Sequence, residues 1–387
     1  GPKGDAGVTG PQYGYRFAST TDVSPSTPSD LGATMLIGAG GHPLIVSSFY
    51  DTGSGGSLIR VTHCADAGCV RPVDPTTITL DGVVGSHSAA IGVDGNPVIA
   101  FTDGFNGDLV VVACNDPICA GDDESESVVD AAAVQIATSV SLAIGHDANP
   151  VIAYRDGSLL RVAKCNDLRC TGGNETLSTL ESNNFGGLGI SMTIGPDTFP
   201  VIAYHVTTGA DLRVAKCNDV ACSGSGEVIT TVEGAQTTSG ERPSVTIGSD
   251  GFPIISYFEN TTDDLEVVKC NDPACSGAGE ITSTVDASVP VSMASSITVL
   301  PNGLPVVSYV GLGNTLKTAF CNDLACSGGN EDIVTVDLTY AVGTAPSAAI
   351  GSLGHPVVAH HGNPGSGGRT LVTAFSRTAW APNVWGR

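Results

Sequence analysis

The stretch SVTIGSDGFPIISYFENTTDDLEVVKCNDPACSGAGEITSTVD, residues 244–286, is one complete unit of a repeat and decides the fold. Its four short apolar segments are separated by turn signals. The first ends at an Asp-Gly turn, and Pro253 opens the second, at a strand position where a missing N–H is tolerated. The third runs into a loop between Cys270 and Cys275, and the fourth follows that loop. We therefore expect each unit to form a blade of four antiparallel strands.

The proline of this unit marks every copy of the repeat. A period near 50 residues, with short apolar strands between turn signals, is typical of a propeller rather than of a helical solenoid. The sequence therefore predicts an all-β fold, a seven-bladed β-propeller with four-stranded antiparallel blades. The copies of the proline are Pro43, Pro97, Pro150, Pro200, Pro253, Pro305 and Pro356.

The last unit lacks a recognisable fourth strand, and it has Ser376 where the other units have cysteine. The missing strand is found at the other end of the chain, because residues 16–22 match fourth strands such as 281–286. An N-terminal strand that completes the last blade would close the ring and remove the exposed edges of an open array. We therefore assign residues 13–387 to the propeller head, with blade seven completed by residues 16–22.

Twelve cysteines form six pairs, and every pair has the same i, i+5 spacing. Zinc sites bring two pairs together or add histidines, whereas each pair here is far from the next and has no partnering His. The spacing favours six local disulfides, which imply an oxidising, extracellular compartment. The pairs are Cys64/Cys69, Cys114/Cys119, Cys165/Cys170, Cys217/Cys222, Cys270/Cys275 and Cys321/Cys326.

The composition describes a loop-rich chain with a lightly charged surface. Of 387 residues, 50 are Gly and 22 are Pro, and only 14% are charged. The net charge of −23 disfavours nucleic acids and anionic membranes, because clustered Lys and Arg bind those partners. The apolar runs are far shorter than a membrane-spanning helix. We expect no nucleic-acid partner and no membrane insertion.

Residues 1–12, GPKGDAGVTGPQ, have glycine at every third position. Such a period is typical of a collagen-like triple helix, in which only glycine fits at the crowded axis, and it implies a homotrimer. Gly1 and Pro2 are also compatible with a remnant of protease cleavage, but residues 3–12 keep the period without them. We interpret 1–12 as the end of a collagen-like stalk and expect a longer stalk upstream.

The combination of a Gly-x-y segment with a globular repeat domain resembles collagen-stalked fibre proteins of bacteria and phages. The repeat, with Lys-Cys-Asn-Asp-x-x-Cys-Ser-Gly at 216–224 and 269–277, is similar to propeller-like repeats of secreted bacterial proteins and covers nearly the whole chain. The resemblance implies a surface adhesin or the receptor-binding tip of a fibre, secreted, on a cell surface or on a virion. It does not identify the ligand, because propellers carry enzymes, lectins and scaffolds alike.

Motifs for catalysis are weak in this sequence. Without a predicted helix there is no nucleophile elbow, and Trp380 and Trp385 do not form the Ser-x-Asp-x-Gly-x-Thr-Trp boxes of sialidase-like propellers. We assign no catalytic residue, although paired carboxylates for glycoside cleavage remain an open alternative. The Asn-Asp pairs in the cysteine loops, such as Asn271 and Asp272, fit Asx turns better than Ca²⁺ sites, which need six to eight oxygens. We expect no cofactor and no metal.

Variation between the copies points to one binding face. The first hairpin loop and the cysteine loop are nearly the same in each unit, whereas the loop between the second and third strands differs. Variable loops on a rigid scaffold are a common site of recognition, although neutral drift gives the same pattern. We call the face that carries them the variable-loop face. Its predicted ligand-binding residues are Tyr50, Asp51, Asp103, Arg155, Asp156, His205, Phe258, Glu259, His361 and Asn363.

These observations predict a non-enzymatic extracellular fibre tip or adhesin that binds a surface glycan or protein, with the homotrimer supplying avidity. The alternatives are a secreted carbohydrate-active enzyme on a propeller scaffold and a purely structural fibre component. Strand direction adds one expectation. An N-terminal strand in the fourth position begins at the cysteine-loop face, so the stalk should attach there and the variable loops should point outward.

Overall fold

The computed structural model describes residues 15–22, 30–51, 56–67, 69, 76–79, 84–104, 106–121, 123–131, 139–182, 189–207, 209–233, 239–287, 294–337, 341–342, 346–363 and 369–377. Within these residues the regular elements are all β-strands, so the all-β prediction is confirmed. No helix in this part of the chain is long and apolar enough to cross a membrane. The predicted collagen-like segment, residues 1–12, lies outside the described residues.

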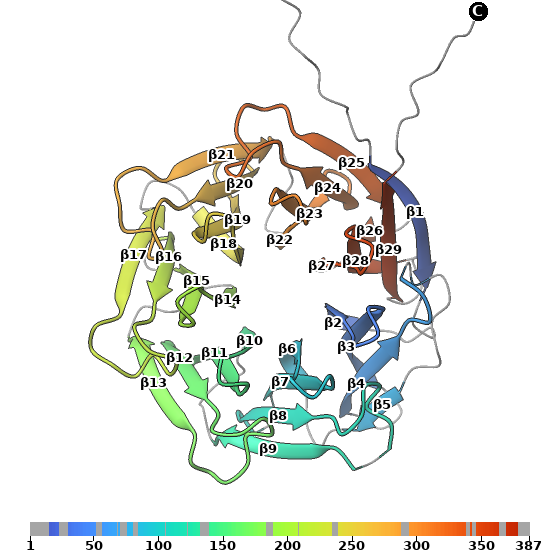
Figure 1. Ribbon diagram of the computed structural model, residues 1–387, viewed down its shortest axis with the longest axis vertical. Coiled ribbons are helices and arrows are strands. Elements are labelled where there is room, and N and C mark those ends of the chain that lie inside the picture. Colours follow the sequence, from blue (N-terminus) through green and yellow to red (C-terminus); the bar gives the residue numbers. More distant parts are fainter. Residues whose placement is uncertain are drawn as a thin grey trace, which may run out of the picture.

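Six sheets of four antiparallel strands stand around a central axis as the blades of a β-propeller (Figure 1). In each blade the strands follow chain order from the axis to the rim. The strands are β2 (Asp30–Ile37), β3 (Pro43–Asp51), β4 (Gly56–His63), β5 (Thr76–Thr79); β6 (Val84–Ile91), β7 (Pro97–Asp103), β8 (Leu109–Ala113), β9 (Ser125–Asp130); β10 (Val140–Ile144), β11 (Pro150–Asp156), β12 (Leu159–Lys164), β13 (Thr176–Glu181); β14 (Ile190–Ile194), β15 (Pro200–Val206), β16 (Asp211–Lys216), β17 (Val228–Glu233); β18 (Ser239–Ile247), β19 (Pro253–Glu259), β20 (Asp264–Lys269), β21 (Ile281–Asp286); β22 (Ser295–Val299), β23 (Pro305–Gly311), β24 (Thr315–Phe320) and β25 (Asp332–Asp337).

A further sheet, the closing sheet, takes strands from both ends of the described chain. Its order is β1 (Tyr15–Asp22), β29 (Arg369–Arg377), β28 (Pro356–Asn363) and β26 (Ala341–Val342), and β27 (Ser347–Ile350) also pairs with β28. β1 pairs antiparallel with β29, as the match of residues 16–22 to fourth strands predicted. The prediction of a seven-bladed propeller is wrong. Two short strands, β26 and β27, lie beside β28 where a regular blade has one, so six blades are regular and the closing sheet has five strands.

The register of the closing sheet also differs from the sequence alignment. In the regular blade β18–β21, Ile254 pairs with Lys269, the residue before Cys270. The equivalent pair in the closing sheet is Val357 with Ala374. Phe375 therefore takes the position of the cysteine, and Ser376 lies one residue beyond it.

The hydrophobic core lies between neighbouring blades. The second strands β7, β15, β19 and β23 are buried along their whole length. In one such interface, Leu109 and Val111 of β8 belong to the same buried cluster as Val140 and Ile152 of the next blade. The second strands are buried on both faces because neighbouring blades cover each sheet on both sides.

Serine hydroxyls link the strands that surround the axis. At six of the interfaces, a serine Oγ on the innermost strand of one sheet accepts a hydrogen bond from a backbone N–H on the innermost strand of the next sheet. One of these bonds runs from Met35 N of β2 to Ser347 Oγ of β27 at 2.9 Å and joins the closing sheet to the first blade. The other bonds run from Leu142 to Ser88, Met192 to Ser141, Val245 to Ser191, Ile297 to Ser244 and Ala348 to Ser296, at 3.0–3.1 Å. Backbone N–H groups on the inner edge of a sheet, where no further strand pairs with them, thus gain hydrogen-bond acceptors.

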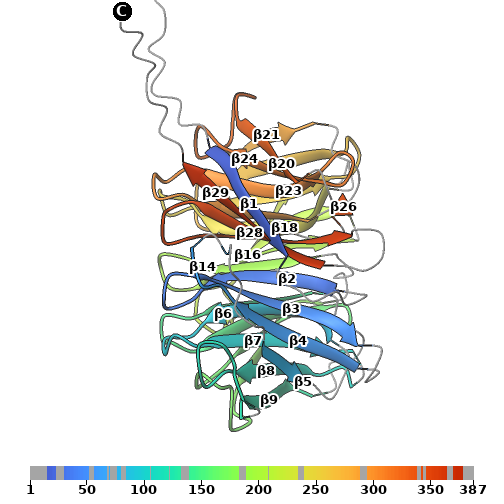
Figure 2. The same cartoon turned by 90° about the vertical axis from the view of Figure 1, so that its right-hand side faces the viewer.

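The first described strand begins at the cysteine-loop face. Tyr15 lies opposite Arg377, at the end of β29. The third strands of the regular blades, such as β20, likewise end where a cysteine loop begins. Figure 2 shows β1 beside β29 at the outside of the propeller. Residue 15 is thus on the side from which the stalk is predicted to leave.

Candidate functional site

The cysteine-loop face is a repeated structural scaffold, and the prediction of six local disulfides is confirmed. The Cα atoms of each pair lie 4.8–5.0 Å apart, within the range that a disulfide requires. No cysteine in the described part of the chain is free. The bonds join Cys64 to Cys69, Cys114 to Cys119, Cys165 to Cys170, Cys217 to Cys222, Cys270 to Cys275 and Cys321 to Cys326.

The backbone of the second cysteine in each pair was not predicted. The i, i+5 spacing treats the two cysteines as equivalent, but the second has a φ of 49–52°, in the left-handed region that residues other than glycine rarely adopt. Its N–H donates to the carbonyl oxygen of the residue three positions earlier, at 3.1–3.3 Å. A tight turn thus fixes the second cysteine where the disulfide closes the loop. These left-handed residues are Cys69, Cys119, Cys170, Cys222, Cys275 and Cys326.

The repeated aspartate orders the same loops. Asp219 accepts hydrogen bonds from the backbone N–H groups of Ala221 at 2.8 Å and Ser223 at 3.1 Å. Burial alone would raise the pKa of Asp219, but these hydrogen bonds outweigh it and lower the pKa. The predicted Asx-turn role is confirmed in this loop. The aspartates that make the same contact in other loops are Asp116, Asp167, Asp272 and Asp323.

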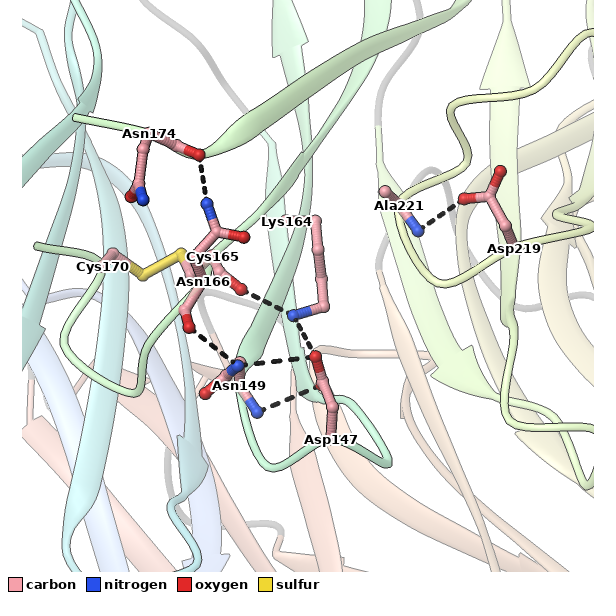
Figure 3. Close-up of polar contacts among 9 residues, drawn as sticks. All are labelled: Asp147, Asn149, Lys164, Cys165, Asn166, Cys170, Asn174, Asp219 and Ala221. Atoms are coloured by element: carbon pink, nitrogen blue, oxygen red, sulfur yellow. Dashed lines mark hydrogen bonds and ion pairs between the residues drawn. A yellow bond between two sulfur atoms is a disulfide. The ribbon is translucent and has the colours of Figure 1, made fainter. Parts of the chain in front are cut away.

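A buried lysine ties the first hairpin to the cysteine loop. Figure 3 shows Lys164 Nζ between the carboxylate of Asp147, at 2.8 Å, and the carbonyl oxygen of Cys165, at 2.6 Å. Asn149 donates to the carbonyl oxygen of Asn166 at 3.1 Å in the same group. The next two blades repeat the ion pair, between Lys216 and Asp197 and between Lys269 and Asp250. Repetition of the same contact in consecutive blades fits a role in the fold.

On the variable-loop face, two predicted binding carboxylates fold back on their own loops. Asp103 accepts a hydrogen bond from Asn106 Nδ2 at 2.7 Å. Glu259 accepts hydrogen bonds from the backbone N–H groups of Thr261 and Thr262, at 3.0 and 2.6 Å. Burial opposes ionisation of Glu259, yet these hydrogen bonds lower its pKa to about 2. Both side chains are buried and hold loop conformations.

Other predicted binding residues are spread between interior and surface. His205, Phe258 and His361 are buried, which places their side chains in the interior. Arg155 is half-buried and donates from Nε to the carbonyl oxygen of Gly157 at 2.7 Å. Asp156 is half-buried in an ion pair described below. The side chains of Tyr50, Asp51 and Asn363 lie outside the described part of the structure.

Polar clusters between neighbouring blades were not predicted from the sequence. In the first of them, Asp130 at the end of β9 reaches across to the next blade. Its Oδ2 accepts a hydrogen bond from the hydroxyl of Tyr154 on β11 at 2.6 Å. The same oxygen pairs with Arg161 Nη1 of β12 at 2.6 Å, and Arg161 also contacts Asp156 at 3.0 Å. We call such a cluster a seam and name it after its tyrosine.

The Tyr204 and Tyr309 seams repeat this arrangement. Tyr204 donates to Glu181 Oε2 at 2.6 Å, and Arg213 pairs with Glu181 and, at 3.0 Å, with Asp211. Tyr309 donates to Asp286 at 2.6 Å, and Lys317 pairs with Asp286 at 2.8 Å. In each seam the acid comes from the rim strand of one blade and its partners come from the next blade. Seams therefore connect blades near the variable-loop face.

A β-bulge aims each of these acids at its neighbour. In the blade β10–β13, Leu160 pairs with Glu181 but Arg161 pairs with Thr179, so one extra residue is inserted before the acidic end of the strand. The same irregularity precedes Glu233 and Asp286. A bulge changes the direction of the side chains that follow it. The sequence contains a signal for the seams, since an acid recurs 23 or 24 residues before each tyrosine.

The Tyr257 seam differs at one position. Register places Glu266 opposite Tyr257, as Arg213 is opposite Tyr204 and Lys317 is opposite Tyr309. Tyr257 donates its hydroxyl hydrogen to Glu266 Oε2 at 2.6 Å. Burial and the negative charges of Glu233, Glu259 and Asp264 raise the pKa of Glu266, although the tyrosine hydrogen bond opposes them. A carboxyl group thus occupies the position of a cation.

Two of the remaining interfaces between sheets each contain a histidine, His360 or His87. His360 is fully buried and takes the tyrosine position of the closing sheet, opposite Leu371. His87 of β6 contacts Ser48 Oγ at 3.0 Å and the carbonyl oxygen of Val46 at 3.1 Å, both in the preceding blade. Burial lowers the pKa of His87 to about 4, against a weaker opposing effect of the Val46 carbonyl. Among the described residues, no group of three or more His, Cys, Asp or Glu is placed to hold a metal ion.

Solved structures share this fold at low sequence identity. A protein of unknown function from Dyadobacter fermentans aligns with a TM-score of 0.58 and 10% identity over 94% of this chain and 100% of its own. The polysaccharide lyase Uly1 aligns with a TM-score of 0.55 and 11% identity over 96% of this chain and 94% of its own. A variant of the NanB sialidase from Streptococcus pneumoniae aligns with a TM-score of 0.50 and 10% identity over 91% of this chain and 69% of its own.

No protein-family model and no curated protein sequence matches the chain. At the identities above, the solved structures support a β-propeller fold and no particular activity. The chain therefore belongs to the class of disulfide-rich β-propellers, and its function has to be argued from its own residues.

Proposed function

We propose that this protein is a non-enzymatic extracellular binding protein, a fibre tip or adhesin, that recognises a surface glycan or protein through the loops of its variable-loop face. One observation carries the proposal. Three of the loops that differ between blades are held by three different local contacts, while the blades beneath them are built alike. A surface of varied, preformed loops on a repeated scaffold suits recognition.

Preformed loops reduce the entropy lost on binding. The loop after β7 is held by Asp103 and Asn106, and the loop after β19 is held by Glu259 and Thr262. In the blade β10–β13, Arg155 is bonded to the carbonyl of Gly157. Each contact lies within its own loop, so the backbone is ordered before a ligand arrives.

Several carboxylates of this face are already engaged, which supports binding rather than catalysis. Asp130, Glu181 and Asp286 each bind a tyrosine and a cation. Glu259, with its pKa near 2, stays ionised at physiological pH and is unsuited to act as a general acid. Acid–base chemistry would have to use other groups.

Trimerisation through the Gly-x-y segment belongs to the same proposal. Weak contacts of one head gain avidity when three heads face a surface together. The start of β1 on the cysteine-loop side supports a stalk that leaves the variable-loop face pointing outward. Six disulfides support secretion into an oxidising environment, on a cell surface or a virion.

A glycan array, followed by affinity measurements on the full chain, tests the proposal. The variant Arg155→Ala should weaken binding to any glycan found, because it releases the loop at Gly157. The variant Arg169→Ala makes the same change at an exposed position of a cysteine loop and should leave binding unchanged. Absence of binding across a broad panel, with hydrolysis of a polysaccharide, would contradict the proposal.

A secreted carbohydrate-active enzyme is the second candidate. The observation in its favour is Glu266, a carboxyl group with a raised pKa beside other carboxylates, as a general acid of glycoside cleavage requires. Turnover of a polysaccharide that is lost in Glu266→Gln, with the fold unchanged, would favour this candidate over the first. A purely structural fibre component predicts neither binding nor turnover.

A further inference from the structure

The Tyr257 seam lies where two blades meet and has a different set of charges from the other three seams. Three seams contain a cation from the third strand, namely Arg161, Arg213 or Lys317. In the Tyr257 seam the same register position is Glu266. The framework is otherwise retained, since the preceding blade still ends in an acid, Glu233, after a bulge. One side chain thus reverses the charge balance of this contact between β17 and the blade β18–β21.

Glu266 has charged or polar neighbours on β17, β19, β20 and β21. From the preceding blade comes Glu233 of β17, whose Oε1 accepts a hydrogen bond from Thr282 at 2.9 Å. β19 contributes Tyr257 and the ionised Glu259, and β20 contributes Asp264. On β21 the residue opposite Glu266 is the uncharged Thr284.

Like charges this close favour retention of a proton. Two or more carboxylates that share a partly buried site cannot all ionise without a large electrostatic cost. Glu259 has three hydrogen bonds that fix its negative charge, from Thr261 N, Thr262 N and Thr262 Oγ1. Among the described contacts, Glu266 accepts one hydrogen bond, from the hydroxyl of the buried Tyr257, so its negative charge has less support than that of Glu259.

We propose that the Tyr257 seam is a pH-sensitive contact, in which a proton on Glu266 takes the place of the cation of the other seams. With that proton, the seam is closed and β19 and β20 pack against the preceding blade. Without it, Glu266 repels Glu233, Glu259 and Asp264, and the contact loosens. The loop between β19 and β20, which Glu259 orders, lies directly beyond this contact. The acidity of the surroundings thereby controls the order of one variable loop.

The direction of the pH dependence follows from the sign of the shift. The pKa of Glu266 in the folded protein is raised above its ordinary value of 4.5. The stabilising contribution is therefore complete below pH 4.5 and is lost as the pH rises through the folded pKa. Seams with Arg213 or Lys317 lack such a proton-dependent carboxyl at this position, so the effect should be local.

Hydrogen exchange of the full chain, followed by mass spectrometry from pH 4 to pH 8, tests the proposal. After correction for intrinsic exchange rates, peptides over 253–269 should lose protection as the pH rises. Peptides over 200–216, in the Tyr204 seam, serve as the internal control and should stay constant. Glu266→Gln, which keeps the hydrogen-bonding shape without the charge, should remove the dependence.

Glu233→Gln provides a second variant, because it removes one of the repelling charges and should weaken the dependence even if Glu266→Gln folds poorly. An equal loss of protection in both seams, or a pH response that survives both substitutions, would overturn the proposal. The readout needs no ligand or substrate, so its failure is distinct from failure of the proposed binding function.

Discussion

The Tyr204 and Tyr257 seams share a framework but differ in charge and in the partner of the tyrosine. Tyr204 donates to Glu181 of the preceding blade, whereas Tyr257 donates to Glu266 of its own blade. Both have an acid at the end of a bulged rim strand, a buried tyrosine on the second strand and a long charged side chain beside it on the third. In one, Arg213 binds Glu181 and Asp211; in the other, Glu266 stands near Glu233, Glu259 and Asp264. The difference shows that the propeller framework accepts a carboxyl group at a seam position where other blades have a cation.

The largest expected effect comes from making the two seams alike. Arg213→Glu removes the cation and adds a third carboxylate between Glu181 and Asp211, at a site where the arginine side chain is 21% exposed. Breaking a buried ion pair leaves uncompensated charge, so the free energy of unfolding at pH 7.5 should fall by about 3 kcal/mol. Urea unfolding measures this change.

The matched control for that charge reversal is Arg169→Glu, at an exposed position of a cysteine loop. Surface substitutions of this kind change stability by about 0.5 kcal/mol or less. If Arg213→Glu were as mild as the control, the ion pairs of the Tyr204 seam would contribute nothing to the contact between its blades.

His87 lies at an interface whose stability should depend on pH in the opposite direction to that of the Tyr257 seam. Its pKa is lowered from 6.5 to about 4 by burial, so its contribution to stability is present above pH 6.5 and is lost as the pH falls through 4. By linkage the loss amounts to about 2 kcal/mol at pH 5. His87→Gln should flatten the acid limb of the stability profile in thermal unfolding scans. An unchanged acid limb would show that His87 is not protonated in this range.

The same substitution in the two seams should have different consequences. Glu181→Gln removes the charge that Arg213 and Tyr204 bind, and it should cost about 1.5 kcal/mol. Glu233→Gln removes a charge that repels Glu266, so at pH 7.5 it should be neutral or slightly stabilising. Chemical denaturation of the two variants side by side checks this. Equal losses would mean that Glu233 supports its seam just as Glu181 does.

The smallest expected effect comes from giving the Tyr257 seam a cation like those of the other seams. Glu266→Arg gives the Tyr257 seam the composition of the Tyr204 seam, with Glu233 in reach as the partner acid. At pH 7.5 the gain should be about 1 kcal/mol, because the attraction within a new, partly buried ion pair is largely offset by the desolvation of its two charges. Thermal unfolding at pH 5 and 7.5 measures it. A loss of stability at both values would show that the site has no room for the arginine.

The repeat predicted the blades because its signals are local. Pro253, the Asp-Gly turn and the Cys270/Cys275 loop each fix a turn within a few residues, and the structure confirms strands on both sides of them. The match of residues 16–22 to a fourth strand also predicted the pairing with β29. The five-stranded closing sheet and the position of Phe375 were missed, because register depends on contacts between strands rather than on sequence alignment.

For the disulfides, the sequence predicted which cysteines pair but not the backbone conformation of the second cysteine. Spacing was enough to pair Cys217 with Cys222, because five residues cannot carry the two sulfur atoms far apart. The left-handed backbone at Cys222 was missed, because that conformation is signalled by glycine or asparagine and not by cysteine. Here the turn formed with Asp219 imposes it, and that turn is visible only in the structure.

The site was harder to predict for the same reason. The sequence indicated which loops vary, but it did not show that Asp103 and Glu259 are turned into their own loops or that His205 is buried. The seams depend on bulges that aim Asp130 or Glu181 at the next blade, and a bulge is visible only in the strand pairing. The recurrence of an acid ahead of each tyrosine is the sequence signal that would have found them.

The charge state of Glu266 is the most direct test of this account. Carbon-13 NMR of the glutamate side-chain carboxyls, with Glu266→Gln to assign the signal, gives its titration curve in the intact protein. The account predicts that Glu266 titrates above 4.5, and that Glu233→Gln moves the midpoint back toward that value. A midpoint at or below 4.5 in the wild-type chain would contradict it, because Glu266 would then be ionised wherever the propeller is folded and no proton would replace the missing cation.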